Sequence, residues 1–201
     1  MHKAYNNKAF NKKEQEKIEQ YVDLAFGFNK THNLFARKSK LEVFKKDIYD
    51  CAQIIPKIKS GKTIADLGSG GGLPGILLSI TKPENKITLI ESNQKKCYFL
   101  RSVTHSLDLK NTTIINKTLV EENNFGRFDI ITARAFATIE KIIRLTKNNI
   151  NKKSEYILLK GREKKIKEEL KLLDKKKHKY EIIKVDNEKQ ERNIVLIKNN
   201  E

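Results

Sequence analysis

The chain has 201 residues, of which 42 are Lys or Arg and 25 are Asp or Glu, and its formal net charge is +17. This length fits one α/β domain with a small extension, and no apolar run approaches the roughly 20 residues that a membrane-spanning helix needs. The N-terminus lacks the apolar segment of a secretory signal, and two distant cysteines do not suggest a disulfide framework. We expect a cytoplasmic protein with reduced thiols and no membrane association, and we expect it to be a monomer.

The positive charge is concentrated in residues 1–46 and 147–179, which flank the central part of the chain. Flanking charge of this kind is typical of a protein that binds a polyanion such as nucleic acid. Codon bias is an alternative explanation, because Lys, Asn and Ile are the amino acids of AT-rich codons and are frequent here.

Residues 1–60 are predicted to form a helical extension. Apolar residues recur at helical spacing between positions 13 and 26, and Gly27 is the expected stop. A second helix is expected over residues 39–58, with Pro56 near its end. Its predicted buried stripe consists of Leu41, Phe44, Ile48, Cys51, Ala52 and Ile55.

Residues 61–201 alternate between strand and helix patterns, as βαβ units do. The chain ends in two apolar runs that flank the polar residues 186–189 and predict a hairpin. The sequence therefore predicts a doubly wound, Rossmann-like α/β sheet with a C-terminal hairpin. Its predicted strands are 62–67, 86–91, 112–116, 128–133, 154–160, 180–185 and 192–198, and its predicted helices are 94–107, 138–147, 162–176 and one that begins at 74.

The motif around which this part is organised is residues 64–75, which read Ile-Ala-Asp-Leu-Gly-Ser-Gly-Gly-Gly-Leu-Pro-Gly. An apolar strand ends at Asp66-Leu67, a glycine-rich turn follows, and Pro74 is suited to the first turn of a helix. Such a turn exposes backbone N–H groups to a ligand and admits it without a Cβ in the way. A tight turn that binds no ligand is the structural alternative.

Two cofactor classes are compatible with this turn. The spacing Gly70-x-Gly72-x-x-Gly75 satisfies the dinucleotide pattern, which is weak when it stands alone. Asp66 stands two residues before the first glycine, and the resulting Asp-x-Gly-x-Gly-x-Gly arrangement instead resembles the first motif of class I S-adenosylmethionine-dependent methyltransferases. Both classes expect an acid for the ribose hydroxyls at the end of the next strand, and Glu91 occupies that place.

Several further motifs make a family resemblance specific. They are residues 29–34, 66–75, 120–121, 134–137 (Arg-Ala-Phe-Ala) and 159–161 (Leu-Lys-Gly). Together they resemble the bacterial 16S rRNA (guanine-N7) methyltransferases of the RsmG family, formerly called glucose-inhibited division protein B. The resemblance covers roughly residues 21–198. It implies a class I methyltransferase domain behind a helical extension, with S-adenosylmethionine as cofactor and a guanine in the decoding-region loop of 16S rRNA, alone or in the small ribosomal subunit, as substrate.

The resemblance also implies site residues. By position, its cofactor contacts are Gly68, Leu73, Val120, Glu121 and Arg134, to which the chemistry of the turn adds Asp66, Gly70 and Glu91. Ordinary alternatives for these residues are a core leucine, a solvated glutamate and a surface loop. Candidate RNA contacts are Lys160 and Arg162, at the end of the fifth strand and just after it, and Asn33. Asn33 and His32 could instead cap the second helix. Phe28, Phe35 and Phe136 are either core residues or platforms on which an unpaired base stacks.

No residue is identified as a certain catalytic group. The Asn/Asp-Pro-Pro-aromatic box of many amino-group methyltransferases is absent, and neither cysteine has the Pro-Cys context of cytosine-C5 enzymes. Guanine N7 needs neither device, because it carries a lone pair and no proton. Arg134 is the candidate for binding a carboxylate, a phosphate or guanine O6, with a surface salt bridge as the alternative. His105 has no partners at ligand spacing, so no metal is expected.

Two positions depart from the family pattern. Leu119 stands where members often have arginine, and Asp47 stands where they often have histidine in the run Arg-His-Ile-Leu-Asp-Ser. Two alternative functions remain at this point. One is a small dinucleotide-binding oxidoreductase, and the other is a basic RNA-binding protein with a vestigial cofactor site.

Overall fold

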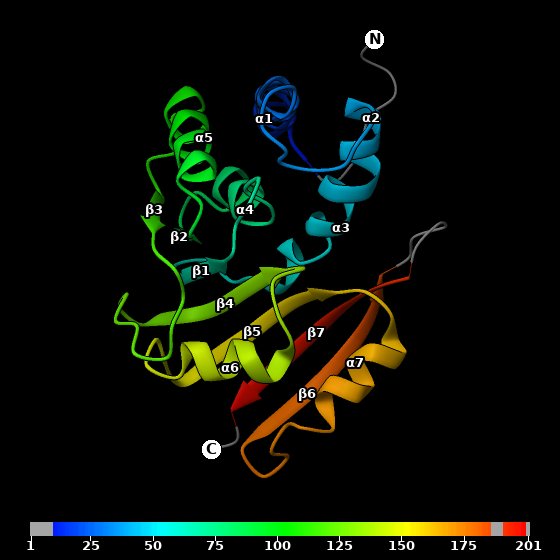
Figure 1. Ribbon diagram of the computed structural model, residues 1–201, viewed down its shortest axis with the longest axis vertical. Coiled ribbons are helices and arrows are strands. Elements are labelled where there is room, and N and C mark those ends of the chain that lie inside the picture. Colours follow the sequence, from blue (N-terminus) through cyan, green and yellow to red (C-terminus); the bar gives the residue numbers. More distant parts are fainter. Residues whose placement is uncertain (1–9, 186–190, 200–201) are drawn as a thin grey trace.

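The computed structural model describes residues 10–185 and 191–199, which form a seven-stranded sheet in the order β3-β2-β1-β4-β5-β7-β6. The first five strands are parallel, and β7 runs antiparallel between β5 and β6 (Figure 1). This is the predicted doubly wound sheet with its C-terminal hairpin. The strands are β1 Thr63–Leu67, β2 Lys86–Glu91, β3 Thr112–Asn116, β4 Phe128–Arg134, β5 Ile150–Lys160, β6 His178–Val185 and β7 Arg192–Asn199.

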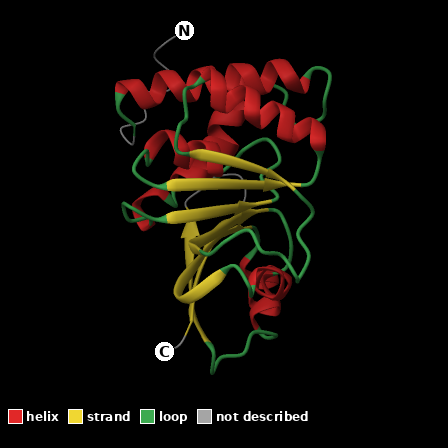
Figure 2. Ribbon diagram, turned by 90° about the vertical axis from the view of Figure 1, so that its left-hand side faces the viewer, coloured by secondary structure: helices red, strands yellow, loops and turns green. Residues whose placement is uncertain are grey.

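Helices cover both faces of the sheet (Figures 1 and 2). One face carries α1 Lys12–Asn29, α4 Gly75–Thr81 and α5 Gln94–Ser106, and the other carries α6 Ile139–Thr146 and α7 Glu163–Leu170. Each layer encloses its own apolar core cluster, because alternate residues of each strand point to opposite faces. None of the described helices is long and apolar enough to cross a membrane.

The extension differs from the prediction in two respects. The first helix passes Gly27 and ends at Asn29, since Gly27 keeps helical backbone geometry on an exposed face. The expected helix over 39–58 runs without a break from Lys40 to Ala52, and Leu41 on it is 38% exposed rather than buried. Its parts are α2 Lys40–Val43, a π-helical stretch Phe44–Ile48 and α3 Tyr49–Ala52, and a separate 3₁₀ turn Ile55–Lys57 contains Pro56.

The extension is joined to the sheet domain by packing and by a hydrogen bond. Ile18, Val22 and Ala25 belong to the same core cluster as residues of α4 and α5. The buried Tyr21 hydroxyl donates to the carbonyl oxygen of Gly71 at 2.7 Å. The first helix is therefore attached directly to the glycine-rich turn.

The C-terminal part also refines the prediction. The helix predicted over 162–176 ends at Leu170, and β5 begins at Ile150 rather than 154, after which the pairing of β4 with β5 shifts register. Strands β6 and β7 form the predicted hairpin, although its turn at 186–189 lies outside the described residues. Strand β6 is the outer edge of the sheet, and Lys179 and Lys184 on it are exposed.

Candidate functional site

The glycine-rich turn after β1 is built mainly by its own backbone. The N–H of Gly68 donates to the carbonyl of Ile90 at 2.8 Å, so the turn starts against the end of β2. Gly68 and Gly70 have φ angles of +61° and +57°, in the left-handed region that only glycine adopts at little cost. The turn therefore requires glycine for its shape, and its backbone remains open to a ligand.

A different requirement applies at Gly75, the first residue of α4. A Cβ there would meet the Leu89 side chain and would lie 2.7 Å from Oδ2 of Asp66. The Gly75 N–H donates to that same Oδ2 at 3.0 Å, so the absence of a side chain lets α4 approach β1 and β2. This contact explains both the glycine and the aspartate of the motif in structural terms.

Asp66 and Glu91 are both buried beside the turn. Burial raises the pKa of Asp66 to about 7, against which the Gly75 hydrogen bond acts, and Asp66 Oδ1 has no partner among the described residues. Glu91 accepts hydrogen bonds from the N–H of Gly70 and from the N–H of Asn93, each at 2.8 Å. The acid at the end of β2 is thus held against the glycine turn, where the sequence places a ribose-binding carboxylate.

A cavity of about 890 Å³ opens at the carboxyl ends of the strands, where ligands bind in such sheets. It brings together six of the predicted site residues, namely Gly68, Gly70, Leu73, Arg134, Lys160 and Arg162. Asp66 and Glu91 lie behind its lining. Val120 is 49% exposed outside the lining, and the Glu121 carboxylate is bound by Lys147 at 3.0 Å and by Arg144 at 3.1 Å.

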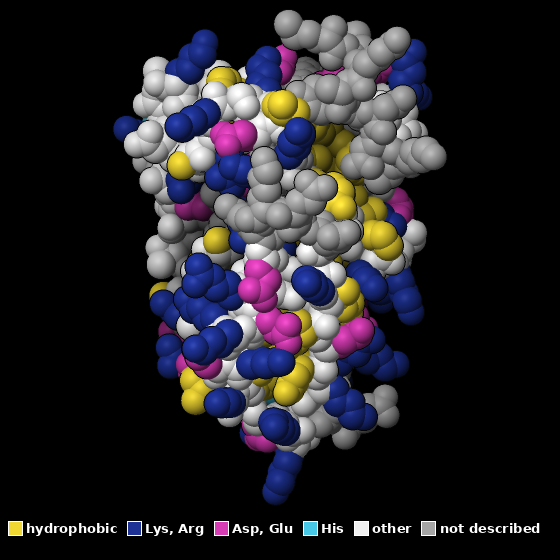
Figure 3. Space-filling model, turned by 90° about the vertical axis from the view of Figure 1, so that its right-hand side faces the viewer, with side chains coloured by type: hydrophobic (Ala, Val, Ile, Leu, Met, Phe, Trp, Pro, Cys, Tyr) yellow, Lys and Arg dark blue, Asp and Glu magenta, His cyan; other side chains and the backbone are white. Residues whose placement is uncertain are grey.

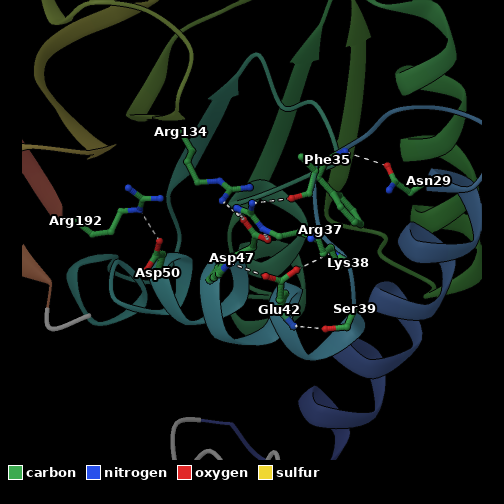
Figure 4. A network of polar contacts seen from close by, with 12 residues as sticks. Asn29, Phe35, Arg37, Lys38, Ser39, Glu42, Asp47, Asp50, Arg134 and Arg192 are labelled. Atoms are coloured by element: carbon green, nitrogen blue, oxygen red, sulfur yellow. Dashed lines mark hydrogen bonds and ion pairs between the residues drawn. The ribbon is translucent and has the colours of Figure 1, made fainter. Parts of the chain in front are cut away.

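Another part of the cavity wall is a set of ion pairs between the extension and the sheet (Figure 4). The buried Asp47 accepts from Arg134 Nη1 at 2.6 Å and from Arg37 through Nε at 2.8 Å and Nη2 at 3.0 Å. Nearby, Asp50 accepts from Arg192 Nε at 3.0 Å. Arg37 and Arg192 carry no motif that identifies them in the sequence. Asp50 matches the aspartate of the family run Arg-His-Ile-Leu-Asp-Ser, and Asp47 departs from it, but neither is predicted as a site residue.

The three candidate RNA contacts lie in different surroundings. The Lys160 ammonium is mostly buried and donates to Glu169 and to the carbonyl of Ala137, each at 2.7 Å. Arg162 is exposed at the cavity rim, and Asn33 is exposed outside the lining. Ser39, and not Asn33 or His32, caps the second helical segment, so the capping alternative for these two residues is wrong.

The three candidate stacking aromatics also differ. Phe28 packs on Phe99 at a ring distance of 4.9 Å and stacks on His32 at 4.3 Å, and it contacts the core. Phe136 lies over Gly68, so a Cβ on this glycine would overlap the ring. Phe35 lines the cavity near Gly71. Phe35 and Phe136 are therefore the two placed at the cavity.

These residues fit the nucleoside cofactor that the resemblance implies. Gly70 and Gly71 line the cavity, and at neither would a Cβ meet another atom closer than 3.7 Å; the buried Glu91 carboxylate accepts from the Gly70 N–H. No group of three or more His, Cys, Asp or Glu side chains that could hold a metal occurs within residues 10–185 and 191–199.

Comparisons with known proteins give the fold and the family. The crystal structure of a precorrin-6y C5,15-methyltransferase from Geobacter metallireducens is similar with a TM-score of 0.59, covering 83% of this chain and 90% of that one at 14% identity. A ribosomal RNA small subunit methyltransferase G from Brachyspira hyodysenteriae is 38% identical over 187 residues, or 91% of this chain and 90% of that protein. Its counterpart from Chromobacterium violaceum is 32% identical over 146 residues, or 73% and 70%.

The family model described as rRNA small subunit methyltransferase G matches residues 14–195. The match includes the extension from its first helix onward, the glycine turn and the hairpin. With the relatives that cover most of the chain, it shows that this protein belongs to the rRNA small subunit methyltransferase G family.

Proposed function

We propose that this protein methylates N7 of a guanine in the decoding-region loop of 16S rRNA. Membership of the family makes it an S-adenosylmethionine-dependent 16S rRNA methyltransferase. Guanine N7 as the modified atom is what the family resemblance implies, and the cavity lining is compatible with it. The carboxylates of that lining, Asp47, Asp50 and Glu169, are each paired with an Arg or Lys side chain, and no His or Cys is among its described residues. This is the structural observation that supports the proposal.

Each of these carboxylates already accepts a hydrogen bond from an Arg or Lys side chain, at 2.6 to 3.0 Å. Among the described residues that line the cavity, no unpaired carboxylate or imidazole is available to take a proton from an exocyclic amine, and no cysteine is available as a nucleophile. Both cysteines are buried, and burial raises the pKa of Cys51 to about 12. Guanine N7 requires neither group, since its lone pair attacks directly and no proton has to leave.

The protein's part in such a reaction is alignment. When bound, S-adenosylmethionine would supply a sulfonium methyl group for transfer to N7, and the electron pair of the broken C–S bond would stay on sulfur. Gly68 and Gly70 would bind the cofactor through their backbone, and Glu91 would accept from its ribose hydroxyls. Leu73 would form an apolar wall, and Arg134 would bind an anionic group or guanine O6. Holding the two reactants in line is the catalytic contribution.

The basic surface supports an RNA partner. Figure 3 shows Lys and Arg side chains gathered over the lower half of one face, where α7 and the hairpin lie. Exposed residues there include Arg162, Lys164, Lys165, Lys171 and Lys184. Arg162 and Lys165 also line the cavity, so the basic surface continues to its rim. We propose this rim, and not the buried Lys160, as the place where RNA phosphates bind.

The remaining proposals concern organisation. We place a division near residue 60 between the extension and the methyltransferase domain, and we expect a cytoplasmic monomer without membrane association. We also propose that the loop containing Val120 and Glu121 contacts the cofactor. Size-exclusion chromatography with light scattering measures the oligomeric state, and a dimer at micromolar concentration contradicts the monomer.

The decisive experiment is a methyl-transfer assay followed by nucleoside analysis. The purified protein is incubated with S-adenosyl[methyl-³H]methionine and either naked 16S rRNA or small subunits, which also identifies the preferred substrate. The expected product is 7-methylguanosine, located by borohydride reduction and aniline cleavage in the decoding-region loop. A different methylated nucleoside contradicts the N7 proposal. Absence of transfer to either substrate favours a vestigial cofactor site, and binding of NADH without S-adenosylhomocysteine favours the oxidoreductase.

A further inference from the structure

Asp47 occupies an unusual place for a carboxylate, because it is 2% exposed and lies between two arginines of different origin. Arg37 comes from the segment before α2 and binds Asp47 through Nε and Nη2, one to each carboxylate oxygen. Arg134 comes from the end of β4, 87 positions along the chain, and binds through Nη1 at 2.6 Å. Asp47 thereby ties the extension to the strand end at the cavity.

This arrangement leaves a definite part of Arg134 available. Within residues 10–185 and 191–199 its guanidinium donates only through Nη1. No residue in those ranges accepts a hydrogen bond from its Nε–Nη2 edge. This is one of the two guanidinium edges that bind a carboxylate or phosphate bidentately. Arg134 lines the cavity, and its side chain is 29% exposed. A guanidinium held at one nitrogen has fewer orientations to lose when the opposite edge binds a ligand.

The bidentate contact of Arg37 gives Asp47 its own fixed orientation. Arg37 is 23% exposed, and its pKa is raised chiefly by the hydrogen bond to Asp47. Without the carboxylate, two guanidinium groups would stand near each other in one wall with no anion between them. The three groups together leave a single positive charge, which suits a singly charged oxyanion.

We propose that Asp47 is a positioning residue that holds Arg134 with its Nε–Nη2 edge ready for an oxyanion in the cavity. The oxyanion is the cofactor's carboxylate or a phosphate of the RNA. The inference rests on the proposed role of Arg134 as an anion-binding residue. It assigns to this chain's aspartate a task in a place where the family often carries histidine.

The test compares ligands with and without the carboxylate. Calorimetry measures the affinity of the full-length protein for S-adenosylhomocysteine and for 5′-methylthioadenosine, which lacks the amino-acid group. We expect Asp47→Asn to weaken S-adenosylhomocysteine about tenfold, the value of one hydrogen bond to a charged group, and to leave 5′-methylthioadenosine unchanged. Glu42→Gln is the matched control, because Glu42 pairs with Lys46 on the same segment outside the cavity lining. It should change neither affinity.

A second arm distinguishes the two sources of the oxyanion. Filter binding measures the affinity for 16S rRNA, and a tenfold loss in Asp47→Asn with unchanged S-adenosylhomocysteine affinity assigns the phosphate. Removing a negative charge from a protein of net charge +17 would by itself strengthen RNA binding, so a loss has the opposite sign to the general charge effect. If Asp47→Asn leaves the affinities for S-adenosylhomocysteine and for 16S rRNA unchanged, the proposal is overturned. Tighter S-adenosylhomocysteine binding also overturns it, because Asp47 would then compete for Arg134.

Arg134→Gln separates this inference from the role of Arg134 itself. If Arg134→Gln leaves both affinities unchanged, the proposed role of Arg134 fails. If Arg134→Gln weakens a ligand that Asp47→Asn does not, the positioning inference alone fails. Adding Asp47→Asn to Arg134→Gln should cause no further loss, since Asp47 acts through Arg134.

Thermal unfolding checks that each variant is folded. Should Asp47→Asn not fold, Arg37→Lys replaces it, because this change keeps the charges and removes the bidentate contact that orients Asp47. It should then weaken the same ligand by a smaller factor. Parent-like affinity for both ligands in Arg37→Lys overturns the proposal.

Discussion

One wall of the cavity is made of backbone from consecutive residues, 68–71, and another is made of charged side chains from distant parts of the chain. The glycine turn keeps its shape through φ angles and close approach, and Gly68 and Gly70 present no side chain to a ligand. The ion-paired wall joins Arg37, Asp47 and Asp50 of the extension to Arg134 and Arg192 at strand ends. Adding a side chain should disrupt the glycine turn, whereas removing a charge should disrupt the ion-paired wall.

The two walls also depend on the rest of the molecule in different ways. The turn needs its neighbours mainly for support, through β2, α4 and the Tyr21 hydroxyl. The ion-paired wall is complete only when the extension is docked, because its aspartates come from the extension while Arg134 and Arg192 come from the sheet. We therefore expect changes in the extension to reach the cavity through these ion pairs, through the Tyr21 hydrogen bond and through Phe35.

The largest effect is expected where the backbone wall meets the core. Gly75→Ala places a methyl group against Leu89 and Asp66 between α4 and the sheet, so it should lower the free energy of unfolding by about 1–3 kcal/mol, as overpacking does. Urea denaturation measures this decrease. Gly27→Ala is the matched control, because nothing lies within 4 Å of its Cβ position in α1. There alanine should stabilise by up to about 1 kcal/mol, and equal destabilisation in the two variants would contradict the steric explanation.

The next change affects the ligand side of the same wall. Gly68→Val should abolish S-adenosylhomocysteine binding, since a branched side chain at φ +61° would displace the Phe136 ring and the turn backbone that face the cavity. Calorimetry and circular dichroism measure binding and fold. Gly61→Val has the same backbone strain, at φ +72°, with open space around it and outside the cavity lining. It should keep its affinity, and parent-like affinity in a folded Gly68→Val would make the turn purely structural.

Asp66 sharpens the comparison through pH. Its pKa of about 7 lies above the ordinary value of 3.8, so folding favours the protonated form. The stability that this proton contributes is complete below pH 4 and is lost as the pH rises through 7. Relative to Asp66→Asn, which cannot ionise, the parent should lose a few kcal/mol between pH 4 and pH 8. Urea denaturation at the two pH values measures the difference, and a parallel pH dependence of the two proteins would refute the raised pKa.

The smallest effect is expected at the rim outside both walls. Changing Lys164, Lys165 and Lys167 to Glu should weaken 16S rRNA binding and lower the log–log salt slope by roughly 0.7 to 0.9 for each phosphate that the variant no longer binds. Lys167 pairs with Glu163 and should contribute least. Lys164 and Lys167 lie outside the cavity lining, so changing these two alone should leave S-adenosylhomocysteine affinity nearly unchanged, because exposed charges more than about 8 Å apart are screened at physiological salt. Lys165 lines the cavity, so its single change shows any direct effect on the cofactor. Equal slopes for parent and variant would support codon bias as the origin of these lysines.

The contrast between the walls explains what the sequence could predict. The glycine turn, Glu91 and the strand–helix order follow from local patterns of glycine, proline and apolar residues, and the structure agrees with them. The ion pairs could not be predicted, because Asp47 and Arg134 meet only after the sheet has formed and the extension has docked. The π-helical stretch Phe44–Ile48 was equally hidden, since the apolar spacing of this segment is that of an ordinary α-helix. Asp47 was visible as a departure from the family pattern, but its partners were not.

The position of β6 at the outer edge of the sheet has a consequence for self-association. An edge strand presents unpaired N–H and C=O groups that can pair with the same edge of another molecule. Exposed Lys179 and Lys184 lie on β6, and Lys177 immediately precedes it. Lys177, Lys179 and Lys184 outnumber the one exposed acid of this strand, Glu181, so two such edges would repel each other on balance and these lysines should oppose edge-to-edge aggregation. Part of the positive charge would then serve to keep molecules apart, and concentrated salt, which screens it, should favour their association.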